Sequence, residues 1–187
     1  EFEQLFEEFT ASYPSTDDGQ QHQRLYVWSR EEASKNVATI REALQQDADI
    51  TDLVLTGLIP HSDTQNHRKA GVWIHVAPCV AGEIRSYFEA SGWTKSEDWP
   101  DVANAIWEFV ETALEAPEEL QQASSSFAAL PETKGLQAGY LSPILNAIQP
   151  DRYIVLNSKS QHVINYFAGT TLSTQIETYS DANEQGW

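Results

Sequence analysis

One apolar stripe at helical spacing, between residues 99 and 114, constrains the fold of this chain more than any other feature. Acidic residues fill the opposite positions, so the pattern predicts a long helix with one buried side. We expect the helix to start near Thr94 to Asp98, to hold Pro100 in its first turn and to end at Pro117. Such a helix needs other elements to cover it. The stripe consists of Trp99, Val102, Ile106, Phe109, Val110, Ala113 and Leu114, and the acidic side of Asp101, Glu108, Glu111 and Glu115.

Helical spacing also recurs before and after this stripe. Phe2, Leu5, Phe6 and Phe9 predict an opening helix, which residues 13–19 should end as a loop. Ser29 and Glu32 match a capping box and predict the start of a second helix, with a stripe formed by Ala33, Val37, Ile40 and Leu44. Shorter helices are expected within 51–59 and 82–91.

The sequence holds one strand-like run. In residues 72–77, Val72, Ile74 and Val76 alternate with Trp73 and His75. The run either pairs with residues 25–28 in a short hairpin or crosses a helical core as an extended segment. We therefore predict a mainly α-helical fold with a minor β element, forming one domain over residues 1–187.

Composition narrows the class of protein. The longest apolar runs fall far short of the ~20 residues of a membrane span, and the single cysteine, Cys79, permits no internal disulfide. We expect a cytoplasmic protein without a membrane partner. The net charge of −17 opposes nonspecific DNA binding. Three basic and four acidic residues lie in 134–187, against no base and nine acids in 97–132, so any contact with a polyanion should lie toward the C-terminus.

Candidate chemical sites are sparse. His61, Asp63, His67 and His75 are weak candidates for metal ligands, because their spacing matches no established metal motif. Neither a nucleophile elbow nor a glycine-rich phosphate loop is present, so we expect neither a cofactor nor catalytic residues in this segment. Trp73 and Trp93 stand near loop-like sequence and are possible aromatic ligand contacts.

Residues 134–169 predict a helix, a tight turn and a second helix. Thr133 should cap the first helix, which contains Pro143, and Pro150 to Tyr153 should end it. Asn157 or Ser158 should cap the second helix, and Gly169 should end it. The layout looks distantly like the helix-hairpin-helix region of base-excision glycosylases. Asn157, however, stands where those enzymes need a catalytic Asp, and an amide cannot act as a carboxylate base.

Three segments together resemble the N-terminal regions of bacterial McrB-like AAA-type restriction ATPases. They are KGLQAGYLSPILNAIQPDRYIVLNSKS (134–160), GVWIHVAPCV (71–80) and GWTKSEDWPDV (92–102). The resemblance implies the N-terminal part of a longer chain, a non-catalytic recognition or docking module that contacts DNA or other domains and subunits of a restriction complex. The motor and the nuclease would lie elsewhere.

The face expected to make this contact carries Lys134, Arg152, Asn157, Ser158 and Lys159. In the DNA hypothesis Lys134 and Lys159 meet phosphates and Asn157 presents its amide. Alternatively, Asn157 and Ser158 only cap a helix. Two other functions compete: an acidic interaction domain that binds a basic partner through Asp101, Glu108, Glu111 and Glu115, and a metal-dependent hydrolase or deaminase that uses the four His and Asp candidates.

Overall fold

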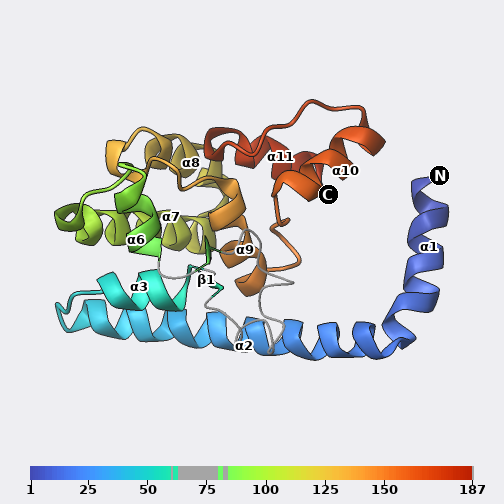
Figure 1. Ribbon diagram of the computed structural model, residues 1–187, viewed down its shortest axis with the longest axis horizontal. Coiled ribbons are helices and arrows are strands. Elements are labelled where there is room, and N and C mark those ends of the chain that lie inside the picture. Colours follow the sequence, from blue (N-terminus) through green and yellow to red (C-terminus); the bar gives the residue numbers. More distant parts are fainter. Residues whose placement is uncertain (60, 63–79, 82–83, 187) are drawn as a thin grey trace.

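The computed structural model describes residues 1–59, 61–62, 80–81 and 84–186, and it is mainly α-helical (Figure 1). The predicted fold class is confirmed. The elements in chain order are α1 (Phe2–Ser12), η1 (Tyr13–Ser15), α2 (Asp17–Gln45), α3 (Thr51–Gly57), β1 (His61–Ser62), β2 (Val80–Ala81), α6 (Ile84–Ala90), η2 (Ser96–Asp98), α7 (Trp99–Glu115), η3 (Pro117–Glu119), α8 (Leu120–Ala128), η4 (Pro131–Thr133), α9 (Ala138–Ile148), α10 (Ser158–Ala168), η5 (Ile176–Thr178) and α11 (Tyr179–Gln185).

Helix α7 is the centre of the hydrophobic core. Its bounds confirm the predicted helix, with Pro100 in the first turn and Pro117 just beyond the end. Six members of the predicted stripe, from Trp99 to Ala113, are buried, and Leu114 is partly buried against the core. The helices α3, α8 and α9 pack against α7, so that its apolar side is covered from several directions.

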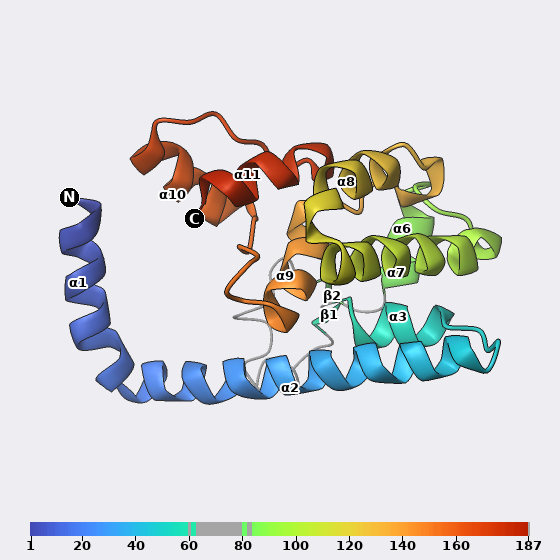
Figure 2. The ribbon, with the colours of Figure 1, turned by 180° about the vertical axis from the view of Figure 1, so that it is seen from behind.

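Helix α2 supports this core from one side along most of the molecule (Figures 1 and 2). Its 29 residues span roughly 43 Å. The C-terminal half contributes Val37 and Ile40 to the core beside α3, whereas Leu44 of the predicted stripe is exposed. The N-terminal half extends past α9 and ends at a sharp corner with α1 (Figure 1).

The corner between α1 and α2 depends on a close backbone approach. Thr16 caps α2, because its Oγ1 accepts a hydrogen bond from the backbone N–H of Gly19 at 3.0 Å. A Cβ atom on Gly19 would lie 2.0 Å from the carbonyl oxygen of Tyr13. Only glycine therefore fits at this corner, and the direction of α1 follows from that fit.

The turn between α9 and α10 is held by hydrogen bonds to three helices, and two of these bonds are fully buried. The Ser142 Oγ of α9 accepts a hydrogen bond from the backbone N–H of Leu156 at 2.8 Å. Asn183 of α11 accepts from the N–H of Ile154 at 2.9 Å and donates to the carbonyl of Arg152 at 3.0 Å. The Tyr153 hydroxyl donates to the carbonyl of Ala113 in α7. Three of these four bonds hold the backbone of the turn, and the fourth anchors the Tyr153 side chain to α7.

The structure corrects several boundaries. Residues 25–28 lie inside α2 and form no hairpin; Tyr26 instead reaches α9, where its hydroxyl donates to Asn146 Oδ1 at 3.2 Å. Ser29 is likewise interior to α2, which the Thr16 cap starts earlier, so the proposed capping box starts no helix. Within the predicted loop 13–19, only the part before Asp17 lies outside α2. Tertiary packing has overridden a short β-prone run, as context often does.

Two further sequence expectations meet different outcomes. Thr133 does not cap α9, because α9 begins at Ala138 with Gln137 before it. The Thr133 hydroxyl instead donates to the carbonyls of Phe127 and Leu130 and closes the turn after α8. Residues 72–77 lie outside the described residues. The described β element is a two-residue parallel pairing of His61 with Val80 and of Ser62 with Ala81.

Candidate interaction surfaces

The three basic residues predicted to face DNA do not share one described hollow. Lys134 is exposed beside a hollow of about 330 Å³ that Glu177 also lines. Arg152 lines a separate hollow of about 280 Å³ together with Glu118 and Glu184. Lys159 is exposed in the first turn of α10. Carboxylates thus lie beside two of the three cations. Their negative charge weakens the attraction of these cations for phosphates.

Asn157 has a structural task that the sequence predicted. Its Oδ1 accepts hydrogen bonds from the backbone N–H groups of Lys159 at 2.9 Å and Ser160 at 3.1 Å. Ser160 Oγ accepts in return from the N–H of Asn157 at 2.9 Å, which completes a capping box. Ser158 is exposed beside it. The amide oxygen of Asn157 is therefore occupied within the chain.

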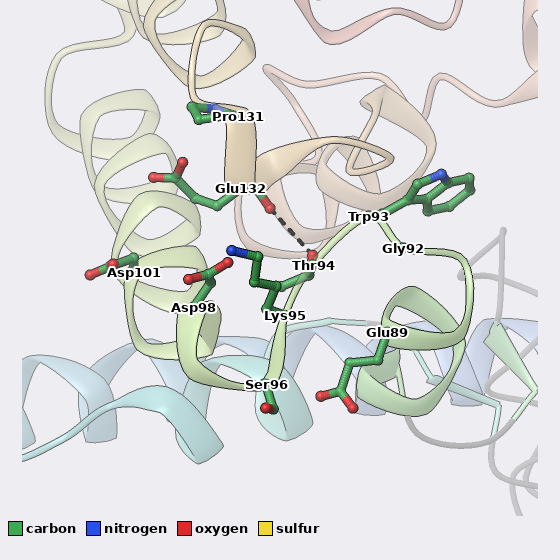
Figure 3. Close-up of a pocket in the computed structure, with 10 residues that line it drawn as sticks. All are labelled: Glu89, Gly92, Trp93, Thr94, Lys95, Ser96, Asp98, Asp101, Pro131 and Glu132. Carbon is green, nitrogen blue, oxygen red and sulfur yellow. Dashed lines mark hydrogen bonds between the residues drawn. The ribbon is translucent and has the colours of Figure 1, made fainter.

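Trp93 lies at the rim of an open hollow of about 730 Å³ (Figure 3). Its half-buried ring packs edge-on against Phe88 at 5.2 Å and Tyr87 at 5.7 Å. A Cβ on Gly135, whose φ is +92°, would lie 2.5 Å from the Trp93 ring. Figure 3 shows the ring pointing away from Lys95. Trp93 is consequently a packing residue of the hollow's wall, and among the described lining residues it is the only aromatic one.

Carboxylates dominate the same hollow. Glu89, Asp98, Asp101 and Glu132 line it, with Lys95 as the one base among the described lining residues. Glu89 already accepts a hydrogen bond from the Trp99 indole at 2.8 Å, and Thr94 donates to the Glu132 carbonyl at 3.4 Å. In the described part of the chain, no three His, Cys, Asp or Glu side chains are placed to hold a metal ion. Asp63, His67, His75 and Trp73 lie outside the described residues, as does the side chain of His61.

The acidic side of α7 is partly used within the chain. The Arg41 guanidinium of α2 donates to Glu111 through Nε at 3.2 Å and also binds Glu115. Partial burial alone would lower the pKa of Arg41, but its hydrogen bonds and charge attraction with these two carboxylates outweigh burial and raise that pKa. Asp101 and Glu108 remain exposed. Two of the four predicted acidic residues are thus engaged by a base of the same chain.

Most of the large apolar side chains that are exposed within the described residues belong to α1 and α10, at the other end of the molecule (Figure 1). We define the aromatic arm surface as Phe2, Phe6 and Phe9 of α1 together with Tyr166 and Phe167 of α10. The three α1 rings are each about half exposed, at 49%, 56% and 52%, and α1 has no buried residue. Tyr166 is 71% exposed.

Ring contacts join the two helices into one surface. Phe2 stacks on Phe6 with centroids 6.1 Å apart, and Phe2 also contacts Phe167 across the gap between helices at 5.0 Å. Phe167 in turn packs edge-on against Tyr166 at 4.9 Å. Aromatic pairs at these distances are attractive. The surface is therefore assembled in the chain before anything binds to it.

The sequence predicted α1 but not this surface. The apolar spacing of Phe2, Phe6 and Phe9 was visible, yet an apolar stripe normally indicates a buried side. One available signal was charge, because residues 1–21 contain six acids and no Lys or Arg. A helix without bases has no cation to pair with the acids of residues 97–132.

Comparison with family models, with curated proteins and with solved structures gave no match for this chain. The likeness to McrB-like proteins therefore remains a sequence resemblance. Among the described helices, none is both long and apolar enough to cross a membrane.

Proposed function

We propose that this chain is a non-catalytic docking module that binds another protein subunit through the aromatic arm surface. The carrying observation is that α1 presents large apolar side chains and buries none of them. Contiguous exposed apolar patches on folded proteins are typical of interaction sites. Within the described residues, eleven large apolar side chains are exposed, and seven of these, Phe2, Leu5, Phe6, Phe9, Val163, Tyr166 and Phe167, belong to α1 and α10.

The finer proposal places this module at the N-terminal side of a McrB-like restriction ATPase. It rests on the resemblance of residues 134–160, 71–80 and 92–102 alone. In this proposal the partner is another domain or subunit of the restriction complex, and the motor and nuclease activities belong to other parts of that complex.

Docking to protein is favoured over docking to DNA for two reasons. Glu177, Glu118 and Glu184 lie in the same hollows as Lys134 and Arg152. Asn157, the residue that would read a base, spends its amide oxygen on the capping box of α10. Exposed aromatic rings, by contrast, are frequent anchors at protein interfaces.

The proposal is tested by capture with matched variants. A tagged chain is incubated with extract of its source cells, and bound proteins are identified by mass spectrometry. We expect at least one protein retained by the native chain and by Leu44→Ser but lost with Phe6→Ser. Leu44 is a suitable control, because it is a 41% exposed apolar side chain on a different part of the surface. Equal retention by all three chains contradicts docking through this surface.

A DNA titration tests whether the chain binds DNA instead of protein. Fluorescently labelled duplexes, with and without modified bases, are titrated with the chain at low and high salt. No binding at low salt is expected. Binding that falls with salt and is abolished in a Lys134→Ala, Lys159→Ala variant would replace the docking proposal with DNA recognition.

A further inference from the structure

The aromatic arm surface is bordered by uncompensated acids. On a helix of 3.6 residues per turn, Phe2, Phe6 and Phe9 share one side of α1, with Glu3 on one flank and Glu8 on the other. Glu7 lies further round on the Glu3 side. Among the described ion pairs, none involves a carboxylate of α1. The apolar stripe therefore lies in a negative field that the chain does not neutralise.

Acidic residues at the corner between α1 and α2 add to this negative field. Asp17 and Asp18 start α2 directly beyond the corner at Thr16. Both are exposed. A segment lying along α1 would therefore have acids beside it from the first turn of α1 to the first turn of α2. The arrangement selects a partner by charge as well as by apolar contact.

Charge also decides against a second copy of this chain. Each copy carries a net charge of −17, and two α1 helices placed side by side would bring their carboxylates together. Like charges across an interface oppose association. A nucleic acid is repelled for the same reason. The complementary occupant has an apolar stripe with basic residues on its flanks.

We propose that the aromatic arm surface binds a basic amphipathic helix of a partner protein. The inference rests on the proposed docking function and specifies the partner's chemistry. The 11 residues of α1 extend about 16 Å, which matches roughly three turns of a partner helix. Its apolar residues would contact Phe2, Phe6 and Phe9, and its Lys or Arg residues would face Glu3, Glu7 and Glu8. Helix recognition through apolar anchors at helical spacing is a recurrent mode of binding.

The test uses two synthetic 16-residue helical peptides with the same leucine stripe. One carries lysine on both flanks of the stripe and the other carries glutamate. Binding to the whole chain is followed by fluorescence anisotropy at low and at high salt. We expect the lysine peptide to bind at least ten-fold more tightly than the glutamate peptide at low salt, and Phe6→Ser with Phe9→Ser to weaken it by ten-fold or more. Circular dichroism checks that the variants keep their helices.

A charge-matched control removes the trivial explanation that any acidic chain binds a basic peptide. Glu3→Gln, Glu7→Gln and Glu8→Gln together should weaken binding several-fold and reduce its salt dependence. Asp101→Asn, Glu108→Gln and Glu119→Gln remove the same number of negative charges from exposed positions elsewhere. They should leave the affinity unchanged. Equal weakening by both triple variants overturns the proposal, because binding would then depend on net charge alone.

The remaining outcomes are also decisive. If neither peptide binds and sedimentation shows a dimer that Phe6→Ser disrupts, the occupant is a second copy; the basic-helix proposal is then wrong while docking through the surface stands. If the glutamate peptide binds as tightly as the lysine peptide, the charge argument is wrong. If capture from extract is insensitive to Phe6→Ser, the docking function itself fails, whatever the peptides do.

Discussion

Helices α1 and α7 are both amphipathic and both carry large apolar side chains at helical spacing, yet one is exposed and the other buried in the folded chain. Nine residues of α7 are buried, and none of α1. Phe109 is 3% exposed and Phe6 is 56% exposed. Amphipathic spacing shows that a helix has a side to cover. It does not show whether the cover comes from the same chain.

The physical difference between the two helices lies in what surrounds them. Helix α7 is approached by α3, α8 and α9. Helix α1 lies beyond the N-terminal end of α2 (Figure 2). It contacts the rest of the chain at the corner with α2 and through the ring contact of Phe2 with Phe167. This contrast predicts four measurable effects on stability.

Removing equivalent rings from the two helices should give very different losses of stability. Phe109→Ala should lower the free energy of unfolding by about 3 to 5 kcal/mol, because it removes a buried ring and leaves a cavity. Phe6→Ala should change it by no more than about 0.5 kcal/mol, as is usual for exposed positions. Urea unfolding followed by circular dichroism measures both. A loss with Phe6→Ala as large as that with Phe109→Ala would show that α1 is packed within the chain.

The turn between α9 and α10 should depend on one buried hydroxyl. Ser142→Ala leaves the buried N–H of Leu156 without its acceptor, and the free energy of unfolding should fall by about 1 to 3 kcal/mol. Ser125→Ala is the matched control, because Ser125 is exposed and bonds only within α8. Similar losses for the two variants in urea unfolding would contradict the assigned role of Ser142.

Substitutions of Asn157 distinguish a helix-capping role from a role in ligand recognition. Asn157→Ala should lower the free energy of unfolding by about 1 kcal/mol, because it removes the acceptor for two backbone N–H groups of α10. Asn157→Asp keeps a capping oxygen and should retain most of the stability. If Asn157→Ala is as stable as the native chain, the capping box contributes nothing and the amide is free for another role.

Asp49→Ala should have the smallest effect on the free energy of unfolding, and this effect should depend on pH. Hydrogen bonds from the Thr51 hydroxyl and then from the Thr51 backbone N–H hold the pKa of Asp49 below its usual value near 3.9. Because the folded-state pKa is the lower one, the stabilisation is present above about pH 4 and is lost as the pH falls through the folded-state pKa. The stability gap between the native chain and Asp49→Ala should therefore narrow on acidification. An unchanged gap from pH 6 to pH 2 would contradict this.

Short-range patterns predicted a good part of the fold. Pro100 and Pro117 bracketed α7, and Asn157 and Gly169 bracketed α10, because caps and prolines act within a few residues. The errors at residues 25–28, Ser29 and Thr133 have different causes. Residues 25–28 lie in a helix whose Tyr26 bonds Asn146, which is distant in sequence. Ser29 is preceded by an earlier cap at Thr16, and the Thr133 hydroxyl bonds the nearby carbonyls of Phe127 and Leu130.

The candidate sites divide in the same way. The cap at Asn157 could be predicted from the sequence. The sequence did not predict that Arg152 and Glu184 line the same hollow, or that Arg41 pairs with both Glu111 and Glu115. These pairs join residues far apart in the chain. The aromatic arm surface is of this second kind, because Phe2 and Phe167 come from nearly opposite ends of the sequence.

Composition and interactions over one or two turns were enough to predict the helical class, the strongly acidic charge and the ends of α7 and α10. Which amphipathic sides are covered depends instead on tertiary contacts. The reason is geometric: Gly19 lets the backbone turn so closely at Tyr13 that α1 points away from the core, and its phenylalanines stay exposed.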